Sequence, residues 1–416
     1  MDLNICIFED SFSKNFHPLS YTRPVFDLRC GIMTLKEKII YDLAPGQTFL
    51  FVRDYLKNDQ KIKNKNQPVN EVPLNTPILF LNGRIVMDDS IKDALLDLDE
   101  NQLLKCDDNV IAAKLTLKNP VNNLEELENL FGATNITGSQ FKIDLAKYPW
   151  ELVNRNGAEI VKDFKRITKN HLDFMNGQVY HGVNLVNDGN IFTGKGSKIK
   201  PGVVLDAEEG PIYIGEDVTI FPNAVIEGPC YIGRNSKIKV GAKIYENTSI
   251  GPVCKVGGEV EESIIHSYSN KQHDGFLGHA YLGSWVNLGA DTNNSDLKNN
   301  YGNVKVFIND EQVDTSSTFV GLTMGDHSKS GINTMFNTGT VVGVSCNIYG
   351  GNFPPKYIPS FSWGGSDGFS TYKLEKSMEV AKKVMARRNV EFTNTDKELF
   401  EKIFQLTLNE RSKRNY

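Results

Sequence analysis

Residues 214–261 read IGEDVT, IFPNAV, IEGPCY, IGRNSK, IKVGAK, IYENTS, IGPVCK and VGGEVE, which are eight consecutive groups of six. An aliphatic residue opens every group: Ile214, Ile220, Ile226, Ile232, Ile238, Ile244, Ile250 and Val256. A small or β-branched residue stands fifth: Val218, Ala224, Cys230, Ser236, Ala242, Thr248, Cys254 and Val260. The pattern predicts a solenoid whose coils stack the first residue inside and bend at the fifth, where the interior is narrow.

The same register continues on both sides of this stretch. Upstream, Ile199 and Leu205 extend it. Downstream, we expect the inward column at Phe276, Leu282, Leu288, Met324, Ser330, Phe336, Val342 and Ile348. Two interruptions break the count, residues 257–275 and 293–318, and the second contains an alternating run at 304–308 typical of a hairpin. Insertions in solenoids form loops that often carry function, so we expect a site near these two interruptions.

Composition excludes several classes of protein. The 416 residues carry a net charge of −5, which gives no general attraction to nucleic acid or to an anionic membrane. No apolar run reaches the roughly 18 residues of a membrane span, and the opening residues lack the features of a signal peptide. Six cysteines without a C-x-x-C pair favour reduced thiols over disulfides or zinc. We therefore expect a cytoplasmic protein that binds neither nucleic acid nor membrane.

The first 165 residues predict a compact α/β unit. Short apolar strands are expected at residues 4–8, 48–52, 77–81 and 109–113, and a helix at 31–43. This alternation favours a mostly parallel sheet that binds ligands at the carboxyl ends of its strands. The loop after the first strand contains Lys14, His17, Arg23 and Arg29, enough positive charge to bind phosphates. Alternatively, Arg23 and Arg29 pair with Asp10 or Asp27.

The chain after Gly368 lacks glycine and predicts two charged amphipathic helices, at residues 371–388 and 395–411. Helices that cap or pack along the solenoid explain this segment adequately. A second interpretation is that Arg387 and Arg388 bind a nucleotide phosphate.

Four motifs carry a family resemblance: PLSYTRPVFDLRCGI from Pro18, YPWELVNRNG from Tyr148, NKQHDGFLGHAYLGSWVNLGADTNNSDLKNN from Asn270 and TMGDHSKSGINT from Thr323. The chain resembles the bifunctional N-acetylglucosamine-1-phosphate uridylyltransferase/glucosamine-1-phosphate N-acetyltransferase (GlmU-type) family, in a divergent short form. The resemblance implies a Rossmann-like α/β nucleotidyltransferase-like domain over 1–165, a linker over 166–190, a left-handed parallel β-helix acyltransferase domain over 191–368 and a helical tail over 369–416. It also implies a homotrimer.

By this resemblance, His273 is the general base of acetyl transfer from acetyl-CoA. A neutral imidazole suits the removal of a proton from an attacking amine near pH 7. His279 competes with it, one hexapeptide later and therefore at a different corner of the prism. We favour His273 because it lies in the interruption, beside Asp274 and Gly275. The alternative is that both histidines only decorate the surface of the solenoid.

The resemblance also implies a set of substrate-binding residues. Asn287 falls on a contact to the acetyl donor or the sugar, and the Ala290 N–H falls on a contact to the thioester oxygen. Phe276 stands where the family commonly has tyrosine, which leaves the identity of the acceptor open. Lys298 and Tyr301 would approach the sugar phosphate across a subunit boundary.

The amino-terminal half departs from the family. The loop G-x-G-T-R-M is missing, and Arg23 stands where a basic residue of that loop is expected. Nucleotide-binding candidates are Arg23, Arg29, Asn82 and Gly83. At the place of the aspartate that binds Mg²⁺ the chain has Arg84, so either Asp88, Asp89 or another carboxylate substitutes or nucleotidyl transfer is lost. The ligands of the metal stay unidentified.

Three functions follow from these observations. The first is acetyl transfer from acetyl-CoA to glucosamine 1-phosphate, combined with Mg²⁺-dependent transfer of a nucleotide from a nucleoside triphosphate to a sugar 1-phosphate. The second is a single-function sugar-1-phosphate nucleotidyltransferase, using UTP or dTTP, whose β-helix is structural. The third is a sugar-nucleotide binder without catalysis.

Overall fold

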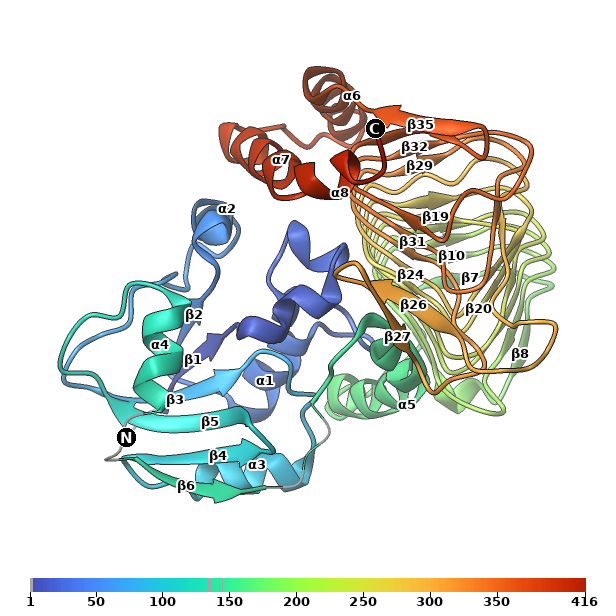
Figure 1. The fold of residues 1–416 in the computed structure, drawn as a ribbon. Coiled ribbons are helices and arrows are strands. Elements are labelled where there is room, and N and C mark those ends of the chain that lie inside the picture. The colour runs from blue at the N-terminus through green and yellow to red at the C-terminus, as the bar shows by residue number, and fades with distance from the viewer. Residues whose placement is uncertain (1–2, 133–135, 142, 144) are drawn as a thin grey trace. The chain divides into compact units, whose positions relative to one another are not determined.

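A computed structural model describes residues 3–132, 136–141, 143 and 145–416 (Figure 1). The chain forms two compact units. Unit 1 takes the described residues of Met1–Phe16, Thr22–Leu28 and Met33–Tyr148, and unit 2 takes His17–Tyr21, Arg29–Ile32 and Pro149–Tyr416. Among the described residues, no helix has both the length and the apolar character needed to cross a membrane.

Unit 1 contains a six-stranded sheet in the order β2-β1-β3-β5-β4-β6. Its strands are β1 (Asn4–Phe8), β2 (Gln47–Phe51), β3 (Pro77–Asn82), β4 (Gln102–Cys106), β5 (Asn109–Thr116) and β6 (Thr137–Gln140). Strand β1 runs parallel to β2 and β3, whereas β5 runs antiparallel to both β3 and β4. The four predicted strands are present, and the sheet is mixed because a hairpin, β4–β5, is added at one side.

The helices of unit 1 are α1 (Leu35–Leu43), α2 (Lys57–Lys63), α3 (Asp89–Leu96) and α4 (Leu124–Phe131), with 3-10 turns η1 (Ser11–Phe16), η3 (Val25–Asp27) and η4 (Asp54–Leu56). The helix predicted from residue 31 begins only at Leu35. Thr34 caps the start of the helix there, because its side chain accepts a hydrogen bond from the Glu37 N–H while the Glu37 carboxylate accepts one from the Thr34 N–H. The core gathers the buried rings of Phe8, Phe51, Phe80 and Phe131.

Unit 2 opens with α5 (Pro149–Thr168), and the chain then winds into a parallel β-helix with three faces (Figure 1). The first face contains β7 (Gln178–Val179), β10 (Lys198–Ile199), β13 (Thr219–Ile220), β16 (Lys237–Ile238), β19 (Lys255–Val256), β22 (Asn270–Lys271), β29 (Lys329–Ser330), β32 (Asn347–Ile348) and β34 (Ser362–Gly365). After β34, β35 (Gly368–Thr371) turns back and pairs antiparallel with it. The second contains β8 (Asn184–Val186), β11 (Val204–Asp206), β14 (Val225–Glu227), β17 (Lys243–Ile244), β20 (Glu259–Glu261), β23 (Phe276–Gly278), β25 (Asn293–Asn294) and β30 (Met335–Phe336). The third contains β9 (Ile191–Thr193), β12 (Ile212–Ile214), β15 (Cys230–Ile232), β18 (Thr248–Ile250), β21 (Ile264–Ile265), β24 (Tyr281–Leu282), β28 (Thr323–Met324), β31 (Val341–Val342) and β33 (Tyr357–Ile358).

Interior stacking follows the predicted columns over most of the prism. Ile214, Ile232 and Ile250 pair in successive coils of the third face and are fully buried. The small residues of the fifth column are buried at the bends, and burial raises the pKa of the Cys254 thiol to about 12. Cys230, Cys254 and Cys346 are therefore core residues rather than nucleophiles.

Two register assignments are wrong. Val260 follows Val256 by only four positions, and it pairs with Ile244 in the inward column instead of standing at a bend. Leu277 then pairs with Val260, which leaves Phe276 on the outward side of its strand. The physical reason is that residues 257–275 do not leave the prism; they form shorter coils through β20, β21 and β22.

The second interruption does leave the prism, as predicted. It forms the antiparallel hairpin β26 (Lys305–Ile308) and β27 (Glu311–Asp314). The tail forms α6 (Leu374–Ala386), α7 (Asn394–Leu406) and α8 (Leu408–Ser412). Two remaining 3-10 turns in unit 2 are η2 (Leu19–Tyr21) and η5 (Asp188–Asn190).

Truncation of an inward side chain should weaken unit 2. Ile232→Ala removes a fully buried group between Ile214 and Ile250, and we expect it to cost about 2–5 kcal/mol of unfolding free energy. Val240→Ala is the matched control, because Val240 is 63% exposed, and it should change stability by less than about 0.5 kcal/mol. Urea denaturation measures both, and equal costs would contradict the interior stacking.

Candidate functional site

The carboxyl ends of β1 and β3 meet at a buried ion pair in unit 1. The Arg84 guanidinium is fully buried and donates to the Asp10 carboxylate through Nη2 at 2.5 Å and Nε at 3.0 Å. It also donates to the Ala146 carbonyl and to Asn109 Oδ1. Asn82 Nδ2 adds a hydrogen bond of 2.8 Å to the same Asp10 carboxylate. Asp10 is thus neutralised and held by side chains of the chain itself.

These residues do not fit a Mg²⁺ ion. Magnesium needs carboxylate or carbonyl oxygens with free lone pairs, and both Asp10 oxygens already accept hydrogen bonds from Arg84. Asp88, one of the substitutes considered from the sequence, caps α3 by accepting from the Ile91 N–H. Over the described ranges of the chain, no group of three or more histidine, cysteine, aspartate or glutamate side chains is arranged to hold a metal.

A cavity of about 280 Å³ opens beside this ion pair, lined by Phe8, Asp10, Ser11, Phe12, Asn82, Lys105, Asp108, Asn109, Val110, Glu128, Phe131 and Gly132. Of the nucleotide-binding candidates, Asn82 lines it and Gly83 follows directly. Gly83 has no room for a side chain, since a Cβ atom would lie 2.7 Å from the Phe26 ring. The Gly83 N–H donates to the Phe8 carbonyl, which joins the ends of β1 and β3.

The two candidate arginines fall in different units. Arg23 lies in unit 1, where its carbonyl accepts from Arg53 Nη2. Arg29 lies in unit 2, where its N–H donates to the Tyr281 hydroxyl and its guanidinium stacks 5.2 Å from the Tyr231 ring centroid. The loop after β1, expected to bind phosphates, therefore divides its two arginines between the units instead of placing both in unit 1.

Removal of the Arg84 charge should destabilise unit 1. Arg84→Met leaves the Asp10 carboxylate buried without its cation, and we expect a loss of about 3–5 kcal/mol in unfolding free energy. Asp10→Asn combined with Arg84→Met should lose clearly less than the sum of the two single variants. Denaturant unfolding of the three variants measures this coupling, and additive losses would contradict the ion pair.

In unit 2, His273 lies on an exposed turn between the first and second faces. The next coil repeats this turn directly against it, because the Asp291 N–H donates to the Asp274 carbonyl at 3.1 Å. Asn287 joins from the first face, where Asn270 Nδ2 donates to Asn287 Oδ1 at 3.2 Å. These two bonds set the register of the coils, which places Ala290 on the turn stacked against the His273 turn and Asn287 three residues before Ala290. We call these two stacked turns, with Asn287, the His273 corner.

The other predicted substrate residues are placed differently. Phe276 follows the same corner, and its N–H donates to Asn293 Oδ1 on the next coil. Lys298 and Tyr301 lie on the excursion that follows β25, where Tyr301 is 73% exposed and its N–H donates to the Lys298 carbonyl. Among the residues that the structure describes, neither Lys298 nor Tyr301 forms a hydrogen bond with His273, Asn287 or Ala290.

A basic group stands on the first face next to this corner. Arg388 Nη2 donates to Asn270 Oδ1 at 2.8 Å. Burial and the nearby charges of Arg388, Lys237, Lys239 and Arg387 hold the pKa of Lys255 below its usual range. These like charges favour an anionic ligand on this face.

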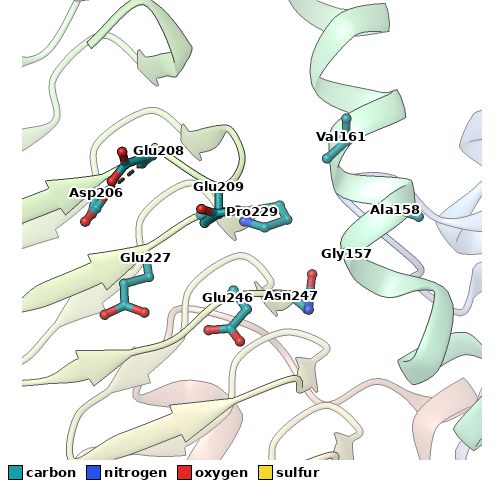
Figure 2. Close-up of a pocket in the computed structure, with 11 residues that line it drawn as sticks. Gly157, Ala158, Val161, Asp206, Glu208, Glu209, Glu227, Pro229, Glu246 and Asn247 are labelled. Carbon is teal, nitrogen blue, oxygen red and sulfur yellow. Dashed lines mark hydrogen bonds between the residues drawn. The ribbon is translucent and has the colours of Figure 1, made fainter. Parts of the chain in front are cut away.

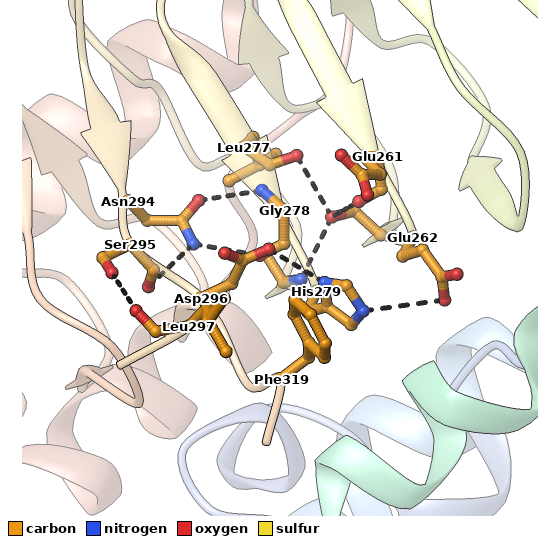
Figure 3. Close-up of polar contacts among 12 residues, drawn as sticks. Glu261, Glu262, Leu277, Gly278, His279, Asn294, Ser295, Asp296, Leu297 and Phe319 are labelled. Carbon is orange, nitrogen blue, oxygen red and sulfur yellow. Dashed lines mark hydrogen bonds and ion pairs between the residues drawn. The ribbon is translucent and has the colours of Figure 1, made fainter. Parts of the chain in front are cut away.

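His279 occupies a separate corner, between the second and third faces (Figure 3). Its Nδ1 lies 2.9 Å from Asp296 Oδ2, its Nε2 lies 3.8 Å from Glu262 Oε2, and Phe319 stacks on the ring at 5.0 Å. Asn294 bonds both the N–H and the carbonyl of Gly278 and so fixes the preceding residue. Sequence reasoning placed His279 at its own corner but missed Asp296, whose only signal is its place in the TNNSDLKNN segment.

Two family models match the chain. Residues 5–171 match "Sugar nucleotidyl transferase", and residues 211–246 match "Bacterial transferase hexapeptide (six repeats)". The chain therefore combines a sugar nucleotidyl transferase domain with hexapeptide repeats.

Curated proteins share the sequence of this chain in part, which supports a divergent, GlmU-like protein. "Bifunctional protein GlmU" of Rippkaea orientalis is 33% identical over 110 residues, 25% of this chain and 22% of the relative. The protein of that name from Synechococcus sp. (strain CC9311) is 28% identical over 171 residues, 41% of this chain and 33% of the relative. The chain therefore spans a third or less of the length of these relatives. A Francisella novicida UDP-N-acetylglucosamine acyltransferase structure covers 56% of this chain and is itself covered to 89%, with 15% identity and a TM-score of 0.28.

The prism also carries an acidic cavity of about 530 Å³, beside α5 (Figure 2). Carboxylates line its prism side, and Gly157, Ala158 and Val161 line its helix side; the carboxylates are Asp206, Glu208, Glu209, Glu227 and Glu246. Burial and the charges of Glu246 and Asp206 raise the pKa of Glu227. Like charges disfavour a phosphate-bearing ligand here, so the basic first face is the better place for one.

Proposed function

We propose that the hexapeptide unit transfers an acetyl group from acetyl-CoA to the amine of an amino-sugar 1-phosphate, glucosamine 1-phosphate, at the His273 corner. The observation that carries the proposal is the juxtaposition of the exposed His273 with Asn287 and the turn that holds Ala290 on the next coil. It supports an acyl transfer because one site then supplies a base and a backbone donor.

The proposed reaction uses groups of this chain. His273 accepts the proton of the acceptor amine, which attacks the thioester carbonyl carbon. The Ala290 N–H stabilises the developing oxyanion, the C–S bond then breaks, and the imidazolium returns its proton to the leaving thiolate of CoA. Asn287 orients the donor or the sugar. Phe276 supplies an apolar surface and no hydroxyl.

Electrostatics support an acyl donor of the CoA type. The phosphates of such a donor would bind the basic group of the first face, where Arg388, Arg387 and Lys255 lie close to Asn270. The proposal includes a cytoplasmic homotrimer, in which Lys298 and Tyr301 of a neighbouring subunit reach the phosphate of the sugar.

For unit 1 we propose a sugar-1-phosphate site in the cavity at the ends of β1 and β3. The match of residues 5–171 to a sugar nucleotidyl transferase model supports nucleotidyl transfer to a sugar 1-phosphate there. The Asp10–Arg84 ion pair favours instead a unit that binds a sugar nucleotide without turnover. In that case only the hexapeptide unit is catalytic.

His273→Ala should slow thiol release from acetyl-CoA in the presence of glucosamine 1-phosphate by about 10²-fold or more, because the base is lost. His181→Ala is the matched control, since it removes an exposed histidine from the first coil. His279→Ala tests the competing imidazole. Loss of activity in His279→Ala but not in His273→Ala would overturn the assignment, and no thiol release by the unchanged protein with a panel of amino-sugar phosphates would overturn the function.

Pyrophosphate release separates the two interpretations of unit 1. Nucleotidyl transfer predicts pyrophosphate from UTP or dTTP when N-acetylglucosamine 1-phosphate is added. A binding unit predicts saturable binding of UDP-N-acetylglucosamine by calorimetry and no pyrophosphate. If the protein neither binds the sugar nucleotide nor releases pyrophosphate, the proposed sugar-phosphate site is contradicted.

A further inference from the structure

Lys271 is a charged residue that follows a run of apolar inward side chains on the first face. Strand pairing places it after Ile220, Ile238 and Val256, all of them apolar and fully buried. Lys271 is only 2% exposed. It ends β22, the two-residue strand directly before the turn that contains His273. An ammonium inside an apolar column costs solvation free energy, so its presence there needs a compensating contact.

That contact is the backbone of His273. Lys271 Nζ donates to the His273 carbonyl at 2.7 Å, from inside the prism, while the imidazole belongs to the exposed turn. Gly258 leaves the space for it: a Cβ atom there would lie 2.6 Å from Lys271 Nζ and 2.5 Å from the His273 oxygen, and its φ of +70° favours glycine. The Lys271 ammonium and the space left by Gly258 therefore meet at the His273 carbonyl.

The electrostatic surroundings agree with this geometry. Desolvation lowers the pKa of Lys271 to about 8, and the charges of Asp274, Asp291 and Glu259 act against that shift. Asp274 and Asp291 belong to the two stacked turns of the His273 corner, so the ammonium also links these turns by charge.

We propose that Lys271 is a positioning residue, which fixes the His273 turn from the interior of the prism so that the imidazole keeps one orientation toward the acceptor. This inference rests on the proposed role of His273. An exposed turn has many conformations, and a misplacement of about 1 Å can cost about 10²-fold in rate. The hydrogen bond from Lys271 holds the backbone of the turn from inside, where neighbouring side chains on the exposed surface give the imidazole little support.

Lys271→Met tests the proposal, because methionine keeps the volume and removes the donor. Lys271→Leu restores an apolar inward residue and is the second variant if the first does not fold. Lys243→Met, which removes a surface lysine paired with Glu259 at 3.4 Å, is the control. We expect both Lys271 variants to lower kcat of thiol release by about 10-fold or more with little change in the KM for acetyl-CoA.

Amide hydrogen exchange of the peptide over residues 270–278 gives a readout without activity. Exchange should be several-fold faster in the Lys271 variants and unchanged in Lys243→Met. Unchanged kcat and unchanged exchange in folded Lys271 variants would overturn the proposal, as would an effect on KM alone. If the unchanged protein releases no thiol, the proposed function fails, and the exchange data alone decide whether Lys271 holds the turn.

Discussion

Each coil of the prism must place one apolar side chain per face in the interior column, since the backbone of a parallel β-helix is satisfied only when successive coils pair in register. Full burial of one isoleucine contributes about 1.5–3 kcal/mol, and the column repeats this gain from coil to coil. The spacing of six residues follows from that requirement. Small side chains at the bends follow from it too, because three faces close on a narrow interior.

The proposed site lies where this constraint is relaxed. Residues 257–275 shorten two sides of the coil, which moves Val260 into the inward column and turns Phe276 outward. The same region admits a lysine into the interior, two residues before His273. The shortened sides of the coil and the buried lysine thus lie in the same stretch of chain as the proposed base.

Unit 1 balances charge in a different way. In a nucleotidyl transferase-like sheet the carboxyl ends of the strands gather acidic groups, and a divalent cation commonly balances them. Here the guanidinium of Arg84 occupies the interior beside Asp10 and is fixed by Asn109 and Ala146. A permanent internal cation stabilises the fold, and it also removes the free carboxylate that a metal would need.

The sequence alone determined the prism, since the period of six appears in every inward isoleucine from Ile214 to Ile250, and it determined the four strands found in unit 1. It also placed His273 and His279 at different corners. Only the tertiary structure decided that Asp10 is bound by Arg84, that Asp296 faces His279 and that Lys271 points inward. These contacts join residues 17 to 74 positions apart or depend on a coil length that the period does not encode. Local periodicity reports which face a side chain takes, whereas partners across coils and strands are set by register.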